Sequence, residues 1–259
     1  MPSSFFYGKL RKMRIHFAAE KRIFMGKERR VMLKLSGEAL AGEKRFGFDD
    51  DIIREVAREV KPALEEGVEL AIMIGGGNFW RGRQSESVDR YKADQIGILA
   101  TAMNCIYTAE LFRTEGIRTK VMSSIPIGDM AELFSKDKAL RLMKKGTVLF
   151  LAGGTGHPYF STDTGVVLRA LELSCEEILL AKAVDGVYDK DPKKDRTAQR
   201  YDTIPLRELV DKRLEVIDLA ASVLCLENHL PLAVFSLREK HGISNALRGK
   251  INGTRVTAV

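Results

Sequence analysis

The sequence predicts an α/β fold in which a mostly parallel sheet carries helices on both of its faces. From residue 31 onward, short apolar runs alternate with amphipathic stretches. These stretches are about ten residues or longer, which is the length of the crossovers that join parallel strands. With 259 residues, 45% of them hydrophobic and 30% charged, the chain can bury the core of one large domain or of two small ones.

The first half of the chain predicts three strand–helix pairs. Residues 49–67 begin with acidic side chains, repeat apolar residues at helical spacing and end at Gly67, so they predict a helix, bent near Pro62. The long stretch 93–116 ends at Gly116 in the same way. The expected strands are 30–36, 68–77 and 118–124, and the expected helices are 49–67, 93–116 and 135–146.

The second half continues the alternation and then places two helices in succession. Apolar runs at 147–156 and 176–186 predict strands on either side of a helix at 162–174. Residues 205–216 and 217–229 predict helices, and 230–236 predicts the last strand. The chain from 30 to 259 is therefore expected to form a single domain.

The net charge of +7 belongs to the start of the chain. Residues 1–30 contain nine lysines and arginines against two glutamates, so the remainder is electrically balanced. A balanced body gives no reason to expect nucleic-acid binding. We interpret residues 1–29 as a basic, disordered leader, or as the product of an upstream start codon assigned in error, in preference to a targeting peptide. The segment lacks the apolar core and cleavage site of a secretory signal.

Cysteine usage and hydropathy indicate a cytoplasmic protein. Cys105, Cys175 and Cys225 are far apart and odd in number, so they form neither a zinc spacing nor a disulfide framework. We expect all three to be buried as small hydrophobic residues. No apolar run approaches the roughly 20 residues of a membrane span.

Glycines and polar residues gather where four predicted strands end. The four sequences are KLSG, IGGGN, AGGTG and AKAVDG. A tight turn would explain one such cluster, but ligands of parallel sheets bind beyond the carboxyl ends of the strands, so the repeated pattern favours one shared site. Bare backbone N–H groups at the start of a helix bind anions, phosphate above all. The triple glycine at 75–77 therefore predicts a phosphate-binding turn.

Two familiar phosphate motifs are excluded, and charged residues suggest another arrangement. GEALAGEK at 37–44 resembles a Walker loop but fails at its end, and no G-x-G-x-x-G follows a strand. Lys34 lies inside an apolar strand, where a lysine is costly unless its ammonium reaches a polar site; a surface lysine on an edge strand is the alternative. Arg81 could bind a phosphate in bidentate fashion. Asp163 opens the next helix as an N-cap, as a partner for a lysine, or as both.

Long motifs resemble those of the bacterial uridylate (UMP) kinases in the amino-acid-kinase superfamily, in family order from about residue 30 to 256. The motifs are VMLKLSGEALAG, IGGGNFWRG, ADQIGILATAMN, GTGHPYFSTDTG, VDGVYDKDPKKD and VIDLAA. The resemblance implies a three-layer αβα sandwich and phosphoryl transfer from ATP, with Mg²⁺ on its phosphates, to UMP. It also implies a homohexamer, activation by GTP and inhibition by UTP. The part before about residue 165 would hold UMP, and the part after it ATP.

The same resemblance assigns residues to sites. The UMP residues would be Gly76, Arg81, Asp94, Thr155, Gly156, His157, Pro158, Tyr159, Phe160, Ser161 and Thr162. The ATP residues would be Lys34, Leu35, Ser36, Gly37, Gly77, Arg81, Tyr188 and Asp191. Catalysis would use Lys34, Asp163, Arg81 and Lys182, with no protein metal ligand. The regulatory loop would be Gly42, Glu43, Lys44, Arg45, Phe46 and Gly47.

Two positions depart from the family pattern. His157 stands where the family usually has Asn, in a loop expected to touch the base. The run AKAVDG lacks the Thr that commonly precedes the lysine, so either Lys182 takes the place near the donor phosphates or the strand slips by one residue. Phe79 and Trp80 are expected to pack rather than bind.

Three other functions are compatible with parts of the sequence. A kinase acting on a carboxylate would share the glycine turns, but Asp94 and the 155–163 loop suit a nucleotide. A non-catalytic nucleotide sensor would not need both Lys34 and Asp163. A nucleic-acid-binding module would depend on the basic leader alone.

Overall fold

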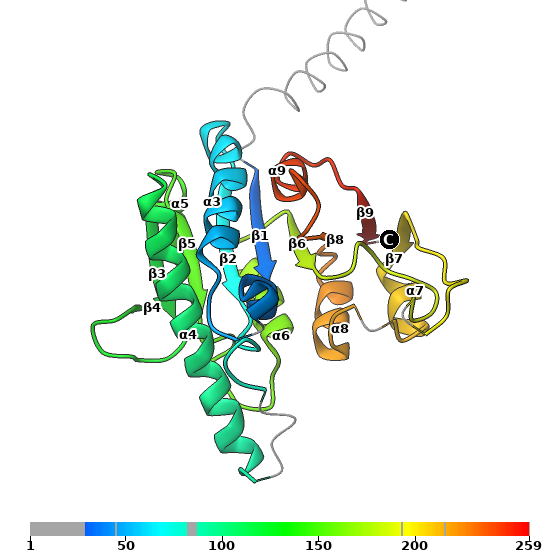
Figure 1. Cartoon of the computed structure of the whole chain (residues 1–259), viewed down its shortest axis with the longest axis horizontal. Coiled ribbons are helices and arrows are strands. Elements are labelled where there is room, and N and C mark those ends of the chain that lie inside the picture. Colours follow the sequence, from blue (N-terminus) through cyan, green and yellow to red (C-terminus); the bar gives the residue numbers. More distant parts are fainter. Residues whose placement is uncertain (1–28, 45, 82–86, 193, 215, 259) are drawn as a thin grey trace, which may run out of the picture.

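The computed structural model describes residues 29–258 except 45, 82–86, 193 and 215, so all but the last residue of the leader proposed at 1–29 lies outside the described residues. The described chain forms one nine-stranded sheet in the order β4-β3-β5-β2-β1-β6-β8-β9-β7 (Figure 1). All strand pairs are parallel except β8 with β9. The strands are β1 (Arg30–Leu35), β2 (Glu69–Ile74), β3 (Thr119–Ser123), β4 (Glu132–Leu133), β5 (Val148–Ala152), β6 (Glu177–Lys182), β7 (Thr203–Pro205), β8 (Leu232–Ser236) and β9 (Gly253–Thr257).

Helices cover both faces of the sheet, which confirms the predicted three layers. One core cluster joins α3, α4 and α9 to the sheet, and the other joins α5, α6, α7 and α8 to the opposite face. Within β1, Leu33 and Leu35 belong to the first cluster and Met32 to the second, as strand alternation requires. The helices are α2 (Gly37–Leu40), α3 (Asp50–Glu65), α4 (Arg90–Thr114), α5 (Lys136–Met143), α6 (Thr162–Glu172), α7 (Leu206–Asp211), α8 (Leu219–Glu227) and α9 (Gly242–Leu247).

Side-chain caps fix where four of the helices begin. Asp49, Asp89, Ser161 and Asp218 each accept a hydrogen bond from a backbone N–H in the first turn of α3, α4, α6 and α8. Helix α4 therefore begins at Arg90, three residues before the predicted start. None of the helices in the described part of the chain is long and apolar enough to cross a membrane.

The C-terminal part of the sheet differs from the sequence prediction. The run 230–236 is not the last strand, because β9 follows it and pairs antiparallel with β8. The helix predicted over 205–216 ends at Asp211, and Arg213 then adopts a left-handed φ of 49°. Helices α2 and α9 and strands β4 and β7 were not predicted, since each is too short to show a period.

The strand order brings the predicted ligand-binding ends together. From β1 at the centre, the chain goes first to β2 on one side and later to β6 on the other, so the order reverses at β1. In such sheets the crevice for ligands opens at this reversal. The carboxyl ends of β5, β2, β1 and β6, which carry the four polar and glycine-rich sequences, are therefore adjacent (Figure 1).

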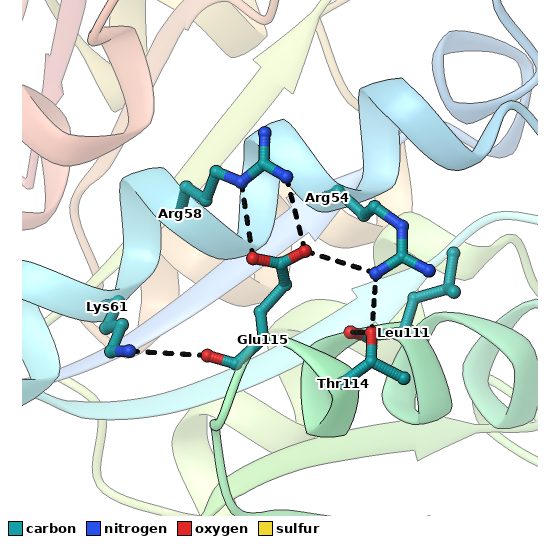
Figure 2. A network of polar contacts seen from close by, with 6 residues as sticks. All are labelled: Arg54, Arg58, Lys61, Leu111, Thr114 and Glu115. Atoms are coloured by element: carbon teal, nitrogen blue, oxygen red, sulfur yellow. Dashed lines mark hydrogen bonds and ion pairs between the residues drawn. The ribbon is translucent and has the colours of Figure 1, made fainter.

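Helices α3 and α4 are joined at their solvent side by a polar network around Glu115 (Figure 2). The Glu115 carboxylate accepts hydrogen bonds from Arg54 Nη1 at 3.1 Å and Arg58 Nε at 3.2 Å, and its carbonyl accepts one from Lys61 at 3.4 Å. The hydrogen bonds from Arg58 and Arg54 lower the pKa of Glu115. These contacts fix the C-terminal end of α4, whose N-terminal half lines the site.

Core packing predicts a large difference between two phenylalanines. The Phe150 ring is 0% exposed and meets the Phe112 ring edge to face at 5.1 Å between centroids. Phe150→Ala is expected to lower the free energy of unfolding by about 3–5 kcal/mol, because a large cavity replaces the ring. Phe160→Ala, at a ring that is 55% exposed, is expected to cost less than about 0.5 kcal/mol. Urea denaturation measures both, and equal losses would contradict the placement of Phe150 in the core.

Candidate functional site

A cavity of about 210 Å³ lies between the turn after β2 and the turn after β5. It brings together seven of the residues predicted to bind UMP: Gly76, Asp94, Thr155, His157, Phe160, Ser161 and Thr162. Trp80 also lines this cavity, and its indole N–H donates to the Ala93 carbonyl at 2.7 Å. Trp80 thus packs, as predicted, and also forms part of the wall.

Asp94 holds the loop that closes one side of this cavity. Its Oδ2 accepts a hydrogen bond from Arg90 Nε at 2.9 Å and another from the Tyr159 backbone N–H at 2.8 Å. The contact fixes Tyr159 at a left-handed φ of 71°. Asp94 lies in the second turn of α4 rather than at its start, so its role is not that of an N-terminal charge on a helix.

Packing requires glycine at Gly76, the middle residue of the triple glycine. A Cβ atom at Gly76 would lie 2.9 Å from both the Ala100 Cβ and the Gly97 carbonyl of α4. A Cβ atom at Gly77 would lie 2.7 Å from Glu38 Oε1. At Gly76 only glycine allows the turn to approach the backbone of α4 this closely, whereas the Glu38 carboxylate could move away from a side chain at position 77.

Lys34 and Asp163 form an ion pair, 3.0 Å between Nζ and Oδ1, with side chains that are 14% and 18% exposed. β1 lies between β2 and β6, so Lys34 is not a surface lysine on an edge strand. The N-cap of α6 is Ser161, so Asp163 is not the cap. No donor is aligned for a hydrogen bond with Asp163 Oδ1, which makes the contact one of charge rather than of a directed bond.

Lys182 occupies the last position of β6, opposite Ser236 of β8. Its ammonium donates a hydrogen bond to the Val216 carbonyl. Burial lowers the pKa of Lys182, and Lys34 lowers it further, whereas Asp163 opposes both. The Asp163 carboxylate thus interacts with the charges of two lysines at the ends of adjacent strands.

Two further cavities, of about 390 and 590 Å³, share one wall beside Lys182. The first contains Tyr188 and Asp191, both predicted to bind ATP, and the second contains Asp163. The shared wall is formed by Lys182, Arg213, Leu214 and Val216. An elongated ligand could therefore extend from Tyr188 toward Asp163.

Several predicted residues lie outside these cavities. Arg81 is half exposed and pairs with Glu38 Oε1 at 2.6 Å. The Leu35 side chain is buried in the core, so only its backbone is available to a ligand. Lys34 lines none of the three cavities, and its contact with Asp163 connects it to the site. The other predicted residues that line no cavity are Ser36, Gly37, Gly156, Pro158 and Tyr159.

The segment predicted to be regulatory packs beside the triple glycine. Gly42–Lys44 forms a single 3₁₀ turn, Phe46 is 67% exposed, and Gly47 contacts Asn78. Arg45 lies outside the described residues.

Two residues beside the reacting groups were not predicted. Asp218 accepts hydrogen bonds from the hydroxyls of Ser161 and Thr164, so it ties the first turn of α6 to α8. It is the third residue of the quoted motif VIDLAA and the N-cap of α8, and an acidic residue just before a helix was a signal for it. Arg213 lines both large cavities, and no sequence pattern singles it out.

The donor set suits a polyphosphate better than a metal held by the protein. Among the described residues, no group of three or more His, Cys, Asp or Glu side chains could hold a metal ion. Lys182 lines the same cavity as Asp163, with which Lys34 is paired. A divalent ion that arrives with the phosphates fits this arrangement, because Mg²⁺ needs few protein ligands there.

The fold and the site define a kinase. The chain belongs to the amino acid kinase family, whose model matches residues 29–236. The matched region includes the lysine–aspartate pair, the glycine turns and every residue that lines the three cavities.

The chain is similar to solved structures of UMP kinases, which confirms the resemblance seen in the motifs. The UMP kinase from Bacillus anthracis is 33% identical with a TM-score of 0.85, over 89% of this chain and 96% of that one. The UMP kinase from Ureaplasma parvum is 31% identical with a TM-score of 0.84, over 90% and 100%. The uridylate kinase from Archaeoglobus fulgidus is 25% identical with a TM-score of 0.65, over 88% and 99%.

The lowered pKa of Lys182 predicts a stability difference that depends on pH. Below the lowered pKa, the lysine is protonated in both the folded and the unfolded chain. Between that pKa and the usual value of 10.5, the unfolded chain binds more protons, so the wild type gains stability as pH rises. Lys182→Met should lack this gain. Denaturation of both proteins from about pH 8 to 10.5 measures the difference, and parallel curves would contradict the prediction.

Proposed function

We propose that the chain transfers the γ-phosphoryl group of ATP to UMP and yields ADP and UDP, a step of pyrimidine nucleotide biosynthesis. The observation that carries this proposal is the Lys34–Asp163 pair between an acceptor cavity and a larger donor cavity. Similarity to UMP kinases over about nine-tenths of the chain supports the choice of substrate.

UMP would occupy the smaller cavity. Its phosphate would lie on the bare backbone at Gly76, with the donor phosphates reaching Gly77 at the next position, and the ribose hydroxyls would donate hydrogen bonds to Asp94. His157 and Phe160, on the loop that Asp94 holds, would contact the base. This assigns the part of the chain before about residue 165 to the acceptor.

ATP would occupy the joined cavities from Tyr188 to Asp163. The adenine would lie near Tyr188, whose hydroxyl donates to Asp185 at 2.8 Å and so fixes the ring. The phosphates would pass Arg213 and Lys182 toward Lys34. Arg81, once released from Glu38, would bind a phosphate at the junction of the two cavities.

Positioning and charge neutralisation would then suffice for the reaction. A phosphate oxygen of UMP attacks the γ-phosphorus, the bond from that phosphorus to the bridging oxygen breaks, and ADP leaves with the electron pair. The UMP phosphate is mostly dianionic at neutral pH because its second pKa is about 6, so no general base is needed. Lys34, held by Asp163, and Lys182 stabilise charge on the transferring group. Mg²⁺ carried by the ATP phosphates supplies further neutralisation.

We also propose assembly into a homo-oligomer, a hexamer by family resemblance, in the cytoplasm, with GTP as activator, UTP as inhibitor and residues 42–47 as part of the regulatory site. A line of exposed apolar residues on α4 supports assembly: Ile96, Leu99, Met103 and Ile106 are 37–51% exposed. Their spacing of three and four residues places them on one face. A contiguous apolar face of this kind commonly marks a protein interface.

Product analysis with a panel of acceptors tests the reaction. With ATP and Mg²⁺, we expect UDP from UMP and no product from AMP or acetylglutamate, measured by ion-exchange chromatography. Lys34→Ala should lower kcat by about 10²–10³-fold, the loss typical of one preorganised charge stabiliser. Lys136→Ala, an exposed lysine at the start of α5, is the matched control and should leave kcat unchanged. Phosphorylation of acetylglutamate, or nucleotide binding without turnover, would refute the proposal.

The assembly proposal predicts that one glutamate on α4 lowers the molecular mass. Met103→Glu places a charge in the centre of the apolar line and should dissociate the oligomer, as measured by size-exclusion chromatography with light scattering. Arg113→Glu, farther along the same face where the exposed residues are polar, should not. A monomeric wild type, or an unchanged mass in Met103→Glu, would refute this interface.

A further inference from the structure

Two buried amides form a closed pair behind the triple glycine. Asn78 Nδ2 donates to Asn104 Oδ1 at 2.9 Å, and Asn104 Nδ2 donates to Asn78 Oδ1 at 2.7 Å. The residues are 2% and 0% exposed. Each amide also donates to a backbone carbonyl: Asn78 to Gly47 at 2.8 Å and Asn104 to Gly75 at 2.7 Å. Because carbonyls only accept, these bonds fix the orientation of both amides.

The pair joins three segments that are far apart in the sequence. Asn78 directly follows the triple glycine, Asn104 belongs to α4, and Gly47 ends the segment 42–47. Gly47 also donates its N–H to the Asn78 carbonyl at 3.4 Å. The segment 42–47 and the glycine turn are thus bonded through one residue.

Aromatic contacts run alongside these bonds. The Phe79 ring meets Phe46 at 5.4 Å and Phe48 at 5.1 Å between centroids, both edge to face. The Phe48 ring stacks on Tyr107 of α4 at 3.8 Å. The chain on both sides of Gly47 therefore packs against the residue after Asn78 and against α4.

The amide pair packs tightly against the turn between β1 and α2. A Cβ atom at Gly37 would lie 2.2 Å from the Gly75 carbonyl, 2.4 Å from Asn78 Oδ1 and 2.9 Å from Asn104 Nδ2. Such close packing gives displacement of one partner little room to be absorbed locally. Buried amides that lose a partner are also costly, which favours either the fully bonded arrangement or a concerted opening.

We propose that the Asn78–Asn104 pair is a positioning element that couples the segment 42–47 to the glycine turn 75–77. When Gly47 is docked on Asn78, the turn keeps the shape that accepts phosphate; when the segment undocks, the turn loosens and phosphate binds more weakly. By thermodynamic reciprocity, a phosphate ligand at the turn strengthens docking of the segment by the same factor. The location of the phosphates at the turn rests on the proposed function, whereas the coupling itself does not.

Hydrogen exchange of the ligand-free chain tests the coupling directly. Asn78→Leu/Asn104→Leu keeps the branched four-atom side chains and removes both amides together, so the only polar groups of the described chain that lose a partner are the Gly47 and Gly75 carbonyls. We expect exchange to become roughly tenfold faster both at 42–48 and at 75–80, with an unfolding midpoint close to that of the wild type. Faster exchange at 42–48 alone, or at neither segment, would overturn the proposal. Should the double variant fail to fold, Asn78→Ser removes both amide donors and serves the same comparison.

Thr101→Val is the matched control. Thr101 is a buried polar residue of the same helix, and its Oγ1 accepts a hydrogen bond from Gly153 N–H at 2.8 Å in the other glycine turn. It should speed exchange near Gly153 and leave 42–48 unchanged. A change at 42–48 in this variant would mean that any loss on α4 loosens the segment, which would refute a specific role for the amide pair.

A ligand experiment tests reciprocity. The chain has one tryptophan, Trp80, two residues after Asn78, so its fluorescence reports binding at the turn. In the wild type, UMP or inorganic phosphate should slow exchange at 42–48, and in the double variant the dissociation constant should rise about tenfold with no such protection at equal occupancy. Binding without protection in the wild type would refute the coupling. If UMP alone fails to bind, the proposed function fails while the ligand-free comparison still decides the coupling.

Discussion

The ion pair between Lys34 and Asp163 is the contact on which the rest of the site depends. It joins the central strand to the first turn of α6, and so it fixes the donor side relative to the acceptor loop. Neither charge is well solvated, and removal of Asp163 would leave the Lys34 ammonium uncompensated, a change that is typically severe. The pair does more than stabilise. Asp163 also interacts with the charge of Lys182, so one carboxylate keeps two ammonium groups close together that would otherwise repel. In the proposed reaction, an incoming polyphosphate would take over part of that compensation, because its negative charges would lie beside both ammonium groups.

The sequence predicted the position of the site better than its internal contacts. Glycines and polar residues at four strand ends were sufficient, because parallel strands align their carboxyl ends whatever their order. Lys34 stood out because a lysine inside an apolar strand needs a polar partner. The pairing of Arg81 with Glu38 was not predictable, since α2 is four residues long and leaves no periodic signal. The pairing register of Lys182 was also not predictable. A shift of one residue turns a side chain to the other face of the sheet but leaves the composition of the strand unchanged.

The C-terminal elements were missed for a related physical reason. Strand β9 contains Arg255, which is exposed, between buried neighbours, and it pairs with β8 in the only antiparallel contact of the described sheet. A strand of five residues with the sequence GTRVT carries little hydrophobic signal of its own. Strand β9 forms because β8 offers an edge with which it can pair. It also depends on α9, whose N-terminus is held by Glu59 from α3. Tertiary contacts, rather than local preference, therefore define this part of the sheet.

Three glycines of the site, Gly37, Gly76 and Gly165, have one common cause, which is close contact with a neighbouring backbone. A Cβ atom would collide with the Gly75 carbonyl at Gly37, with the Gly97 carbonyl at Gly76, and with Gly154 at Gly165 of α6. Each clash joins a turn at a strand end to the element beside it. Four strand ends can converge on one small ligand only if their turns pack backbone against backbone, because side chains would hold them farther apart. The absence of side chains also leaves backbone N–H groups accessible, and a phosphate can accept hydrogen bonds from such groups. Packing and anion binding are thus two consequences of one constraint, and a glycine here cannot be assigned to either alone.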